Sequence, residues 1–159
     1  MFVSHGSLIT MSPFMICRLQ LPRFYTIASC PKVHGDSIHL TVAVTKEQLQ
    51  DGSFFEGVCS PHIADKRNQS LRVFVRPSTF RLPSSLETPV LMVGPGTGIA
   101  PFRAFMEQRV FDGGKGRNWL FFGDQSSKTE FYYKEQIEGW MDSGDLYRFT
   151  TAWSRDQAE

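Results

Sequence analysis

The chain has 159 residues with a formal net charge of +1 and 21% charged residues, which fits one ordinary globular domain and lacks the basic surface that nucleic acids or anionic membranes attract. No apolar run is long enough to cross a bilayer. The three cysteines, Cys17, Cys30 and Cys59, have no CxxC spacing, so they indicate neither a disulfide framework nor a zinc site but a reduced, cytoplasmic setting.

The first half of the chain predicts antiparallel β-structure. Residues 1–20 are a poorly defined lead-in without the basic segment of an export signal. Residues 22–29 are rich in aromatic and branched side chains, and residues 37–44 alternate apolar with polar; the turn signal Gly35-Asp36 between them predicts a hairpin. Residues 46–55 predict a loop, residues 57–65 a short helix around Pro61, residues 71–76 a third strand and residues 77–85 a loop.

The period changes from Thr88 onward. Residues 90–93 are continuously apolar, which is typical of a strand buried on both faces. A turn at residues 94–98 leads into an apolar-periodic run with Pro101 in its first turn, the position that a helix tolerates best. Residues 118–123 and 146–153 predict two further strands. Between them residues 129–141 predict a helix that Ser143-Gly144 ends; its apolar face carries Tyr133, Ile137, Trp140 and Met141.

The fold class is therefore α+β in two parts. Residues 21–86 predict a partial antiparallel β-barrel, and residues 87–159 predict a truncated Rossmann-like unit with the order βαβαβ and a parallel sheet. The boundary is expected near residues 84–87.

Two segments of the second part suit phosphate groups. The glycine turn at residues 94–98 would present backbone N–H groups at the start of a helix, which is a site for a phosphate or pyrophosphate. A tight turn that needs small residues only for packing is an equal alternative. Ser154 and Arg155 follow the last strand, where open α/β sheets bind ligands, and suit a phosphate monoester such as the 2′-phosphate of NADP. The alternative is a solvated loop arginine.

Two segments of the first part suit a flavin. Arg23, Tyr25 and Thr26 offer a guanidinium for a pyrophosphate, a ring to stack on isoalloxazine and a hydroxyl near its redox nitrogen. Taken alone, an ordinary amphipathic strand is the favoured interpretation. The turn at residues 57–60 could offer N–H groups to a pyrophosphate, or Ser60 could simply cap a helix ahead of Pro61. Within it, Cys59 is expected to be a small buried residue rather than a reactive thiol.

Seven motifs occur together in a fixed order: RFYT (23–26), TVAV (41–44), GVCS (57–60), FRLP (80–83), GPGTGIAPFRAF (94–105), WLFFG (119–123) and AWSRDQ (152–157). In this order they resemble the ferredoxin–NADP reductase superfamily, and within it the diflavin reductase branch. The pattern is most similar to the flavoprotein subunits of NADPH-dependent sulfite reductases, with the NADPH–cytochrome P450 reductases as near relatives. The resemblance covers residues 21–157.

The resemblance implies an FAD-binding part at residues 21–86 and an NADP-binding part at residues 87–159. It implies hydride transfer from NADPH to FAD, then electron transfer through FMN, on a missing or separate domain, to an electron-acceptor protein. That acceptor would be the sulfite reductase haemoprotein or another haem protein. No nucleic acid or membrane partner is implied.

The resemblance also implies roles for individual residues. Arg23 would hold the FAD pyrophosphate, Tyr25 would stack on the isoalloxazine beside Phe24, and Thr26, the catalytic candidate, would lie near flavin N5. The remaining cofactor-binding candidates are Thr41, Val42 and Ala43 along the FAD, Gly57, Val58, Cys59 and Ser60 at the FAD phosphates, Gly96, Thr97 and Gly98 at the NADPH pyrophosphate and nicotinamide side, and Ser154 and Arg155 at the 2′-phosphate.

The chain departs from the family in two respects. It has Thr26 where the family usually has serine, and the Lys-x-Tyr-x-Gln segment that follows SRDQ in the family is absent, so we expect a fragment. Two alternatives to a sulfite reductase flavoprotein module therefore stay open. One is a cytochrome P450 reductase-like electron donor, and the other is an inactive truncated remnant or partner-binding piece without turnover.

Overall fold

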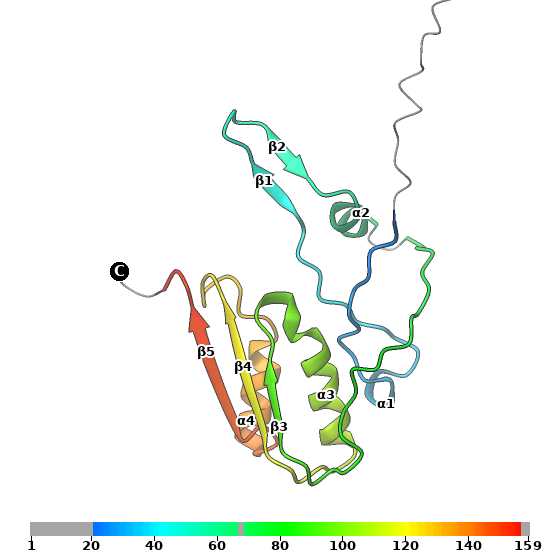
Figure 1. The fold of residues 1–159 in the computed structure, drawn as a ribbon, viewed down its shortest axis with the longest axis vertical. Helices are drawn as coiled ribbons and strands as arrows, with labels where there is room; N and C mark the ends of the chain where they lie inside the picture. The colour runs from blue at the N-terminus through cyan, green and yellow to red at the C-terminus, as the bar shows by residue number, and fades with distance from the viewer. Residues whose placement is uncertain (1–20, 67–68, 157–159) are drawn as a thin grey trace, which may run out of the picture.

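The computed structural model describes residues 21–66 and 69–156 (Figure 1). The expected lead-in at residues 1–20 lies outside the described residues. The elements in chain order are α1 (Pro31–His34), β1 (Lys46–Gln48), β2 (Phe54–Glu56), α2 (Cys59–Asp65), β3 (Val90–Val93), the 3₁₀ helix η2 (Gly96–Ile99), α3 (Ala100–Phe111), β4 (Asn118–Asp124), α4 (Lys134–Ser143) and β5 (Arg148–Trp153). The predicted α+β class is confirmed, although the strands of the described residues close no barrel.

The second half of the chain folds as predicted, into a parallel sheet with the order β3-β4-β5. Met92 of β3 lies opposite Leu120 of β4, and Leu120 lies opposite Phe149 of β5. A right-handed crossover between successive neighbouring strands places each connecting helix on the same side of a sheet. Accordingly, α3 and α4 share one core, in which Met92 and Leu120 pack with Met106, Ile137 and Trp140.

The opposite face of this sheet is open, so the expectation that β3 is buried on both faces is wrong. Leu91 and Val93 point away from Met92 because side chains alternate along a strand, and they are 61% and 60% exposed. Their partners in register are Trp119 and Phe121, whose rings stack with centroids 4.7 Å apart. The apolar run indicated a sheet interior, but only one of its faces receives helices.

The expected hairpin over residues 22–44 is not formed by two continuous strands. A single antiparallel bridge joins Ile27 to Leu40. Between them, at the position of the predicted turn, the chain makes the one-turn helix α1, which starts at Pro31 and is followed by Gly35 with φ of 57°. Proline at the first helical position and glycine just past the last one is the usual arrangement of helix ends.

The third expected strand, at residues 71–76, is also wrong, because the segment pairs with no strand of the described chain. Val73, Phe74 and Val75 are exposed. Alternation of apolar and polar residues selects a face, but a strand forms only where a neighbouring backbone accepts its hydrogen bonds.

The expected loop at residues 46–55 is instead the hairpin of β1 and β2. Lys46 pairs with Glu56 in register, and their side chains form an exposed ion pair at 2.7 Å. The turn is built around Asp51-Gly52, with φ of 83° at Gly52 and the backbone N–H of Ser53 donating to the Asp51 carboxylate at 2.9 Å. An Asp-Gly pair between two short segments is a hairpin signal.

The last helix starts later than predicted. Tyr133 has φ of 58° and ψ of 28°, a left-handed conformation that a right-handed helix excludes, so α4 begins at Lys134. Its predicted end is confirmed by Gly144, which has φ of 79°. On its predicted apolar face Ile137 and Trp140 are buried, whereas Met141 is exposed. No helix among residues 21–66 and 69–156 combines the length and apolarity that crossing a membrane requires.

Candidate functional site

The turn after β3 leaves no room for a side chain at Gly94. A Cβ atom at Gly94 would lie 2.7 Å from the carbonyl oxygen of Gly98 and 2.7 Å from the ring of Phe102. Gly96 has φ of 54°, which glycine adopts readily. The turn passes through η2 directly into α3, so its backbone N–H groups collect at the start of a twelve-residue helix, the arrangement that binds anions.

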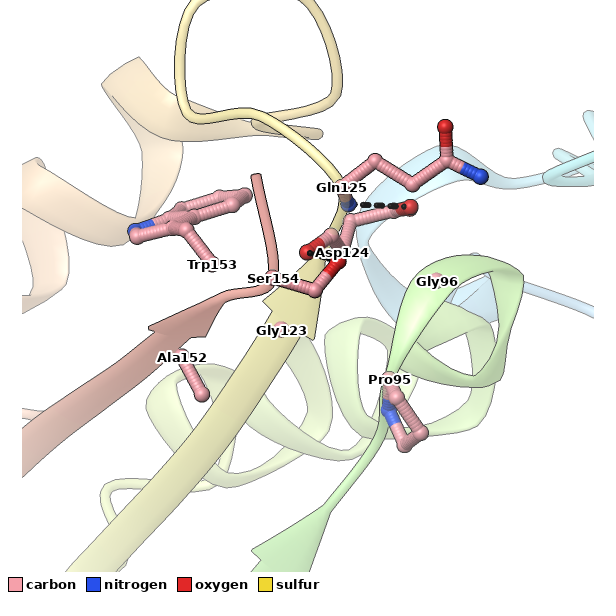
Figure 2. A pocket seen from close by; sticks show the side chains of 8 residues that line it. All are labelled: Pro95, Gly96, Gly123, Asp124, Gln125, Ala152, Trp153 and Ser154. Carbon is pink, nitrogen blue, oxygen red and sulfur yellow. Dashed lines mark hydrogen bonds between the residues drawn. The ribbon is translucent and has the colours of Figure 1, made fainter. Parts of the chain in front are cut away.

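A hollow of about 700 Å³ lies at the carboxyl ends of all three parallel strands. It is lined by Pro95 and Gly96 after β3, by Gly123, Asp124 and Gln125 at the end of β4, and by Ala152, Trp153 and Ser154 at the end of β5 (Figure 2). This is the edge at which open α/β sheets bind ligands, and the volume is within the range of small-molecule sites.

Backbone hydrogen bonds fix the segment that follows β5. The N–H of Ser154 donates to the carbonyl of Asp124 at 3.0 Å, and the N–H of Arg155 donates to the carbonyl of Gln125 at 2.8 Å. The side chains of Ser154 and Arg155 remain exposed. The sequence-predicted residues Gly96 and Ser154 thus line one hollow, with Arg155 directly beyond its rim.

Asp156, which the sequence did not single out, holds the loop after β4 against this segment. Its carboxylate accepts a hydrogen bond from the Ser126 hydroxyl and another from the backbone N–H of Ser127, both at 2.9 Å. The hydrogen bonds from Ser127 and Ser126 lower the pKa of the Asp156 carboxyl below its ordinary value. The two loops that border the hollow are therefore joined.

The first half of the chain brings two of the predicted flavin motifs together. Tyr25 lies beside Cys59 at the start of α2, and this neighbour, followed by burial, raises the pKa of Tyr25. Residues 23–26 and 57–60 therefore meet at one place. The other residues of the first motif are exposed: Arg23, Phe24 and Thr26. The Phe24 ring packs edge-on against the Phe74 ring, with the ring centroids 5.8 Å apart.

The turn before α2 is held by the segment that precedes β1. The backbone N–H of Gly57 donates to the carbonyl of Thr45 at 3.0 Å, and the buried hydroxyl of Ser60 accepts from the N–H of Thr45 at 3.0 Å. Cys59 is half-buried and Val58 is exposed. The Ser60 hydroxyl therefore stabilises the turn by its hydrogen bond, whereas the Val58 side chain is exposed to solvent.

Of the three candidates at residues 41–43, Thr41 contacts the second half of the chain. The Thr41 hydroxyl is 2.6 Å from the hydroxyl of Tyr133. Val42 lines an apolar hollow of about 250 Å³ with Leu40, Val44 and α2, and Ala43 is exposed.

Among the described residues no cluster of three histidine, cysteine, aspartate or glutamate side chains is arranged to hold a metal ion.

A buried carboxylate that the sequence analysis missed joins the two halves. Glu107 of α3 is 4% exposed. It accepts hydrogen bonds from the backbone N–H of Cys30 at 2.8 Å and from the Gln136 amide at 3.0 Å. His34 Nε2 lies 2.9 Å from it and Arg103 Nη2 lies 2.8 Å from it. Burial raises the pKa of the Glu107 carboxyl, but the hydrogen bonds and the Arg103 charge outweigh burial, so the pKa is lowered.

Comparison with known families agrees with this two-part architecture. Residues 5–62 match the family described as FAD binding domain, and residues 92–159 match the family described as oxidoreductase NAD-binding domain. A segment similar to FAD-binding domains therefore precedes a segment similar to the NAD-binding domains of oxidoreductases.

Three individual relatives of the chain are all one kind of flavoprotein. The chain is 46% identical over 140 residues to the sulfite reductase [NADPH] flavoprotein alpha-component of Yersinia pestis, 44% over 158 residues to that of Zymomonas mobilis and 45% over 139 residues to that of Photorhabdus laumondii. The predicted kinship with the sulfite reductase flavoproteins is confirmed. These alignments cover 86%, 97% and 86% of this chain but 23%, 26% and 23% of the relatives, so the chain spans about a quarter of their length.

Proposed function

We propose that this chain is a module of an NADPH-dependent flavoprotein oxidoreductase that passes electrons from NADPH through FAD to a separate acceptor. The observation that carries the proposal is the hollow at the carboxyl ends of β3, β4 and β5, which combines the glycine turn with the Ser154-Arg155 segment. The match of residues 5–62 to an FAD-binding domain and of residues 92–159 to an NAD-binding domain supports binding of both cofactors.

The residues of the hollow fit a dinucleotide phosphate. Gly96 and Thr97 would take the pyrophosphate on backbone N–H groups at the start of α3, and Gly98, whose own N–H donates to the Pro95 carbonyl at 2.9 Å, would lie beside it. A side chain at Gly94 would close the turn. Ser154 and Arg155 would take the 2′-phosphate, because a hydroxyl and a guanidinium are strong donors to a phosphate dianion. Their backbone positions are set by bonds to β4.

The flavin side fits through the two motifs that meet at Tyr25 and Cys59. Arg23 would pair with the FAD pyrophosphate, Tyr25 would stack on the ring system, and the backbone of residues 41–43 and 57–60 would hold the rest of the cofactor. Bound FAD would supply the acceptor for a hydride and release electrons singly. Thr26 would place its hydroxyl beside the reacting nitrogen, and the protein's contribution is orientation and exclusion of water.

The setting of the module follows from its relatives. We propose residues 21–86 as the FAD-binding part and residues 87–159 as the NADP-binding part, in a cytoplasmic protein. An FMN domain and a sulfite reductase haemoprotein are the partners that we propose; the relatives' names, which read sulfite reductase [NADPH] flavoprotein, support a sulfite reductase system. A cytochrome P450 reductase-like donor and a segment without turnover are the competing functions. Turnover with sulfite reductase haemoprotein favours the first function, turnover with a cytochrome P450 alone favours the second, and turnover with neither favours the third.

The binding test uses titration calorimetry with NADP⁺ and NAD⁺ on the chain and on the variant Arg155→Ala. We expect the wild type to prefer NADP⁺ and R155A to lose at least about tenfold of that preference, since a charge-assisted phosphate contact contributes about 1.5–3 kcal/mol. Arg117→Ala is the matched control, because Arg117 lies at the amino end of β4 and stacks on Tyr147 at 4.7 Å.

The flavin test is the absorbance spectrum of the protein mixed with FAD, before and after NADPH is added under anaerobic conditions. Bleaching of the bound flavin supports the proposal. An unchanged NADP⁺ preference in R155A, or the absence of binding to both dinucleotides, contradicts it.

A further inference from the structure

One charged side chain faces the hollow that we assign to a polyanion. Of the eight residues that line it, Asp124 alone carries a formal charge. Figure 2 shows this side chain reaching from the end of β4 toward the turn that carries Gly96. A Cβ atom built on Gly96 would lie 3.5 Å from Asp124 Oδ2, so the carboxylate stands directly beside the proposed pyrophosphate site.

The position of this carboxylate is fixed and its charge is not neutralised by a neighbour. Asp124 Oδ1 accepts the backbone N–H of Gln125 at 2.8 Å, which leaves Oδ2 toward the turn. In the described part of the chain no ion pair involves Asp124. After burial, the charge of Asp124 is the next cause that raises the pKa of the nearby Tyr132.

We propose that Asp124 sets the affinity of the hollow for dinucleotides, because its carboxylate opposes phosphate at the Gly96 turn and leaves the 2′-phosphate contacts at Ser154 and Arg155 unaffected. The inference rests on the proposed function. Its physical basis is repulsion between a fixed carboxylate and a pyrophosphate held on the neighbouring backbone. A like charge placed against a competing contact is a common way to obtain specificity.

The consequence differs between ligands. A nucleotide that carries the pyrophosphate meets the repulsion whether or not it also carries a 2′-phosphate. A nucleotide that carries only the 2′-phosphate does not meet it at all. Because the hollow is open to water, which weakens the repulsion, we expect an effect of about tenfold in affinity, or about 1.4 kcal/mol.

The experiment measures dissociation constants for NADP⁺, NAD⁺ and 2′-AMP by titration calorimetry at low and high salt. The proteins are the wild type, Asp124→Asn and Asp124→Glu. The control is Asp142→Asn, an exposed carboxylate in the last turn of α4, which leads into the amino end of β5. Urea unfolding of each variant establishes that it is folded, and Asp124→Ser serves as the neutral variant if D124N is not.

The expected result is that D124N binds both NADP⁺ and NAD⁺ about tenfold more tightly, with 2′-AMP unchanged and the gain shrinking as salt rises. D124E and D142N should match the wild type. A D124N variant that binds NADP⁺ equally or more weakly overturns the inference; weaker binding would assign the carboxylate to a ribose hydroxyl instead. If neither wild type nor D124N binds a dinucleotide, the proposed function and this inference fall together, whereas wild-type binding without a gain removes the inference alone.

Discussion

Replacing Glu107 by alanine tests whether one buried carboxylate holds the two halves of the chain together. Four donors converge on it: the Cys30 N–H, His34, Arg103 and Gln136. Cys30 and His34 belong to the flavin side, and Gln136 belongs to α4. The Glu107 and Arg103 side chains are 3% and 9% exposed, so the substitution would leave a guanidinium buried without its carboxylate.

The magnitude follows from the cost of that unpaired charge. Hydrogen bonds to charged groups contribute about 1.5–3 kcal/mol each, but four such values cannot simply be added, because burying the carboxylate itself is unfavourable. Removing one partner of a buried ion pair typically lowers stability by about 3–5 kcal/mol. We expect the free energy of unfolding of Glu107→Ala to fall by that amount, which is a large part of an ordinary domain's stability of about 5–15 kcal/mol.

The assay is urea unfolding followed by circular dichroism, with the change taken from the midpoint at constant slope. The matched control is Glu138→Ala in α4, whose i,i+4 pair with Lys134 spans 3.8 Å with both side chains 58% exposed; it should change stability by at most about 0.5 kcal/mol. Equal effects of the two substitutions would refute the reasoning, since burial and convergence of donors are what distinguish the two glutamates.

Two further predictions concern the same helix and the turn before it. The pKa of the Glu107 carboxyl is lowered from 4.5 in the folded state. The contribution of the Glu107 carboxylate to stability is therefore complete above that pH and is lost as the pH falls further. The free energy of unfolding should fall less steeply with acid in Glu107→Gln than in the wild type, and parallel curves would contradict this. Gly94→Ala should abolish NADP⁺ binding and destabilise the chain, because its Cβ atom would lie 2.7 Å from the Gly98 carbonyl. Gly139→Ala, which meets nothing within 4 Å inside α4, should instead stabilise by about 0.5–1 kcal/mol.

The parallel half was predictable because its signals are local. Each strand is a short apolar run, and each is followed by a glycine or polar turn and a helix, so the connections themselves fix a parallel order. Because the carboxyl ends of parallel strands share one edge, the predicted order of the strands also places Gly96 and Ser154 at the same edge of the sheet. Gly144 could be recognised as a helix end for a similar reason, because the residue after the last turn needs a left-handed conformation.

The antiparallel half was predicted poorly because alternation does not specify a partner. Residues 71–76 alternate as well as any strand in the chain, yet strand formation depends on a second backbone that the sequence pattern does not identify. The hairpin of β1 and β2 is the converse case. Its residues are exposed on both strands, and Phe54 and Phe55 are adjacent rather than alternating with polar residues. No amphipathic pattern therefore marks it, and Asp51-Gly52 is the local signal.

The buried charges of α3 explain why the joint between the halves could not be predicted. The apolar spacing of Phe102, Phe105 and Met106 predicts an amphipathic helix with one core face, and this pattern gives no sign that charged residues are buried. Yet α3 buries Arg103, Glu107 and Arg109, and Arg109 Nη2 donates to the carbonyls of Leu86, Thr88 and Gly116 at 2.9–3.1 Å. A charged residue is buried only where distant backbone groups and side chains converge to bind it. The glycine turn at the start of α3 is a local feature, whereas the donors that bind Glu107 come from positions as far away as Cys30, and only the folded chain brings them together.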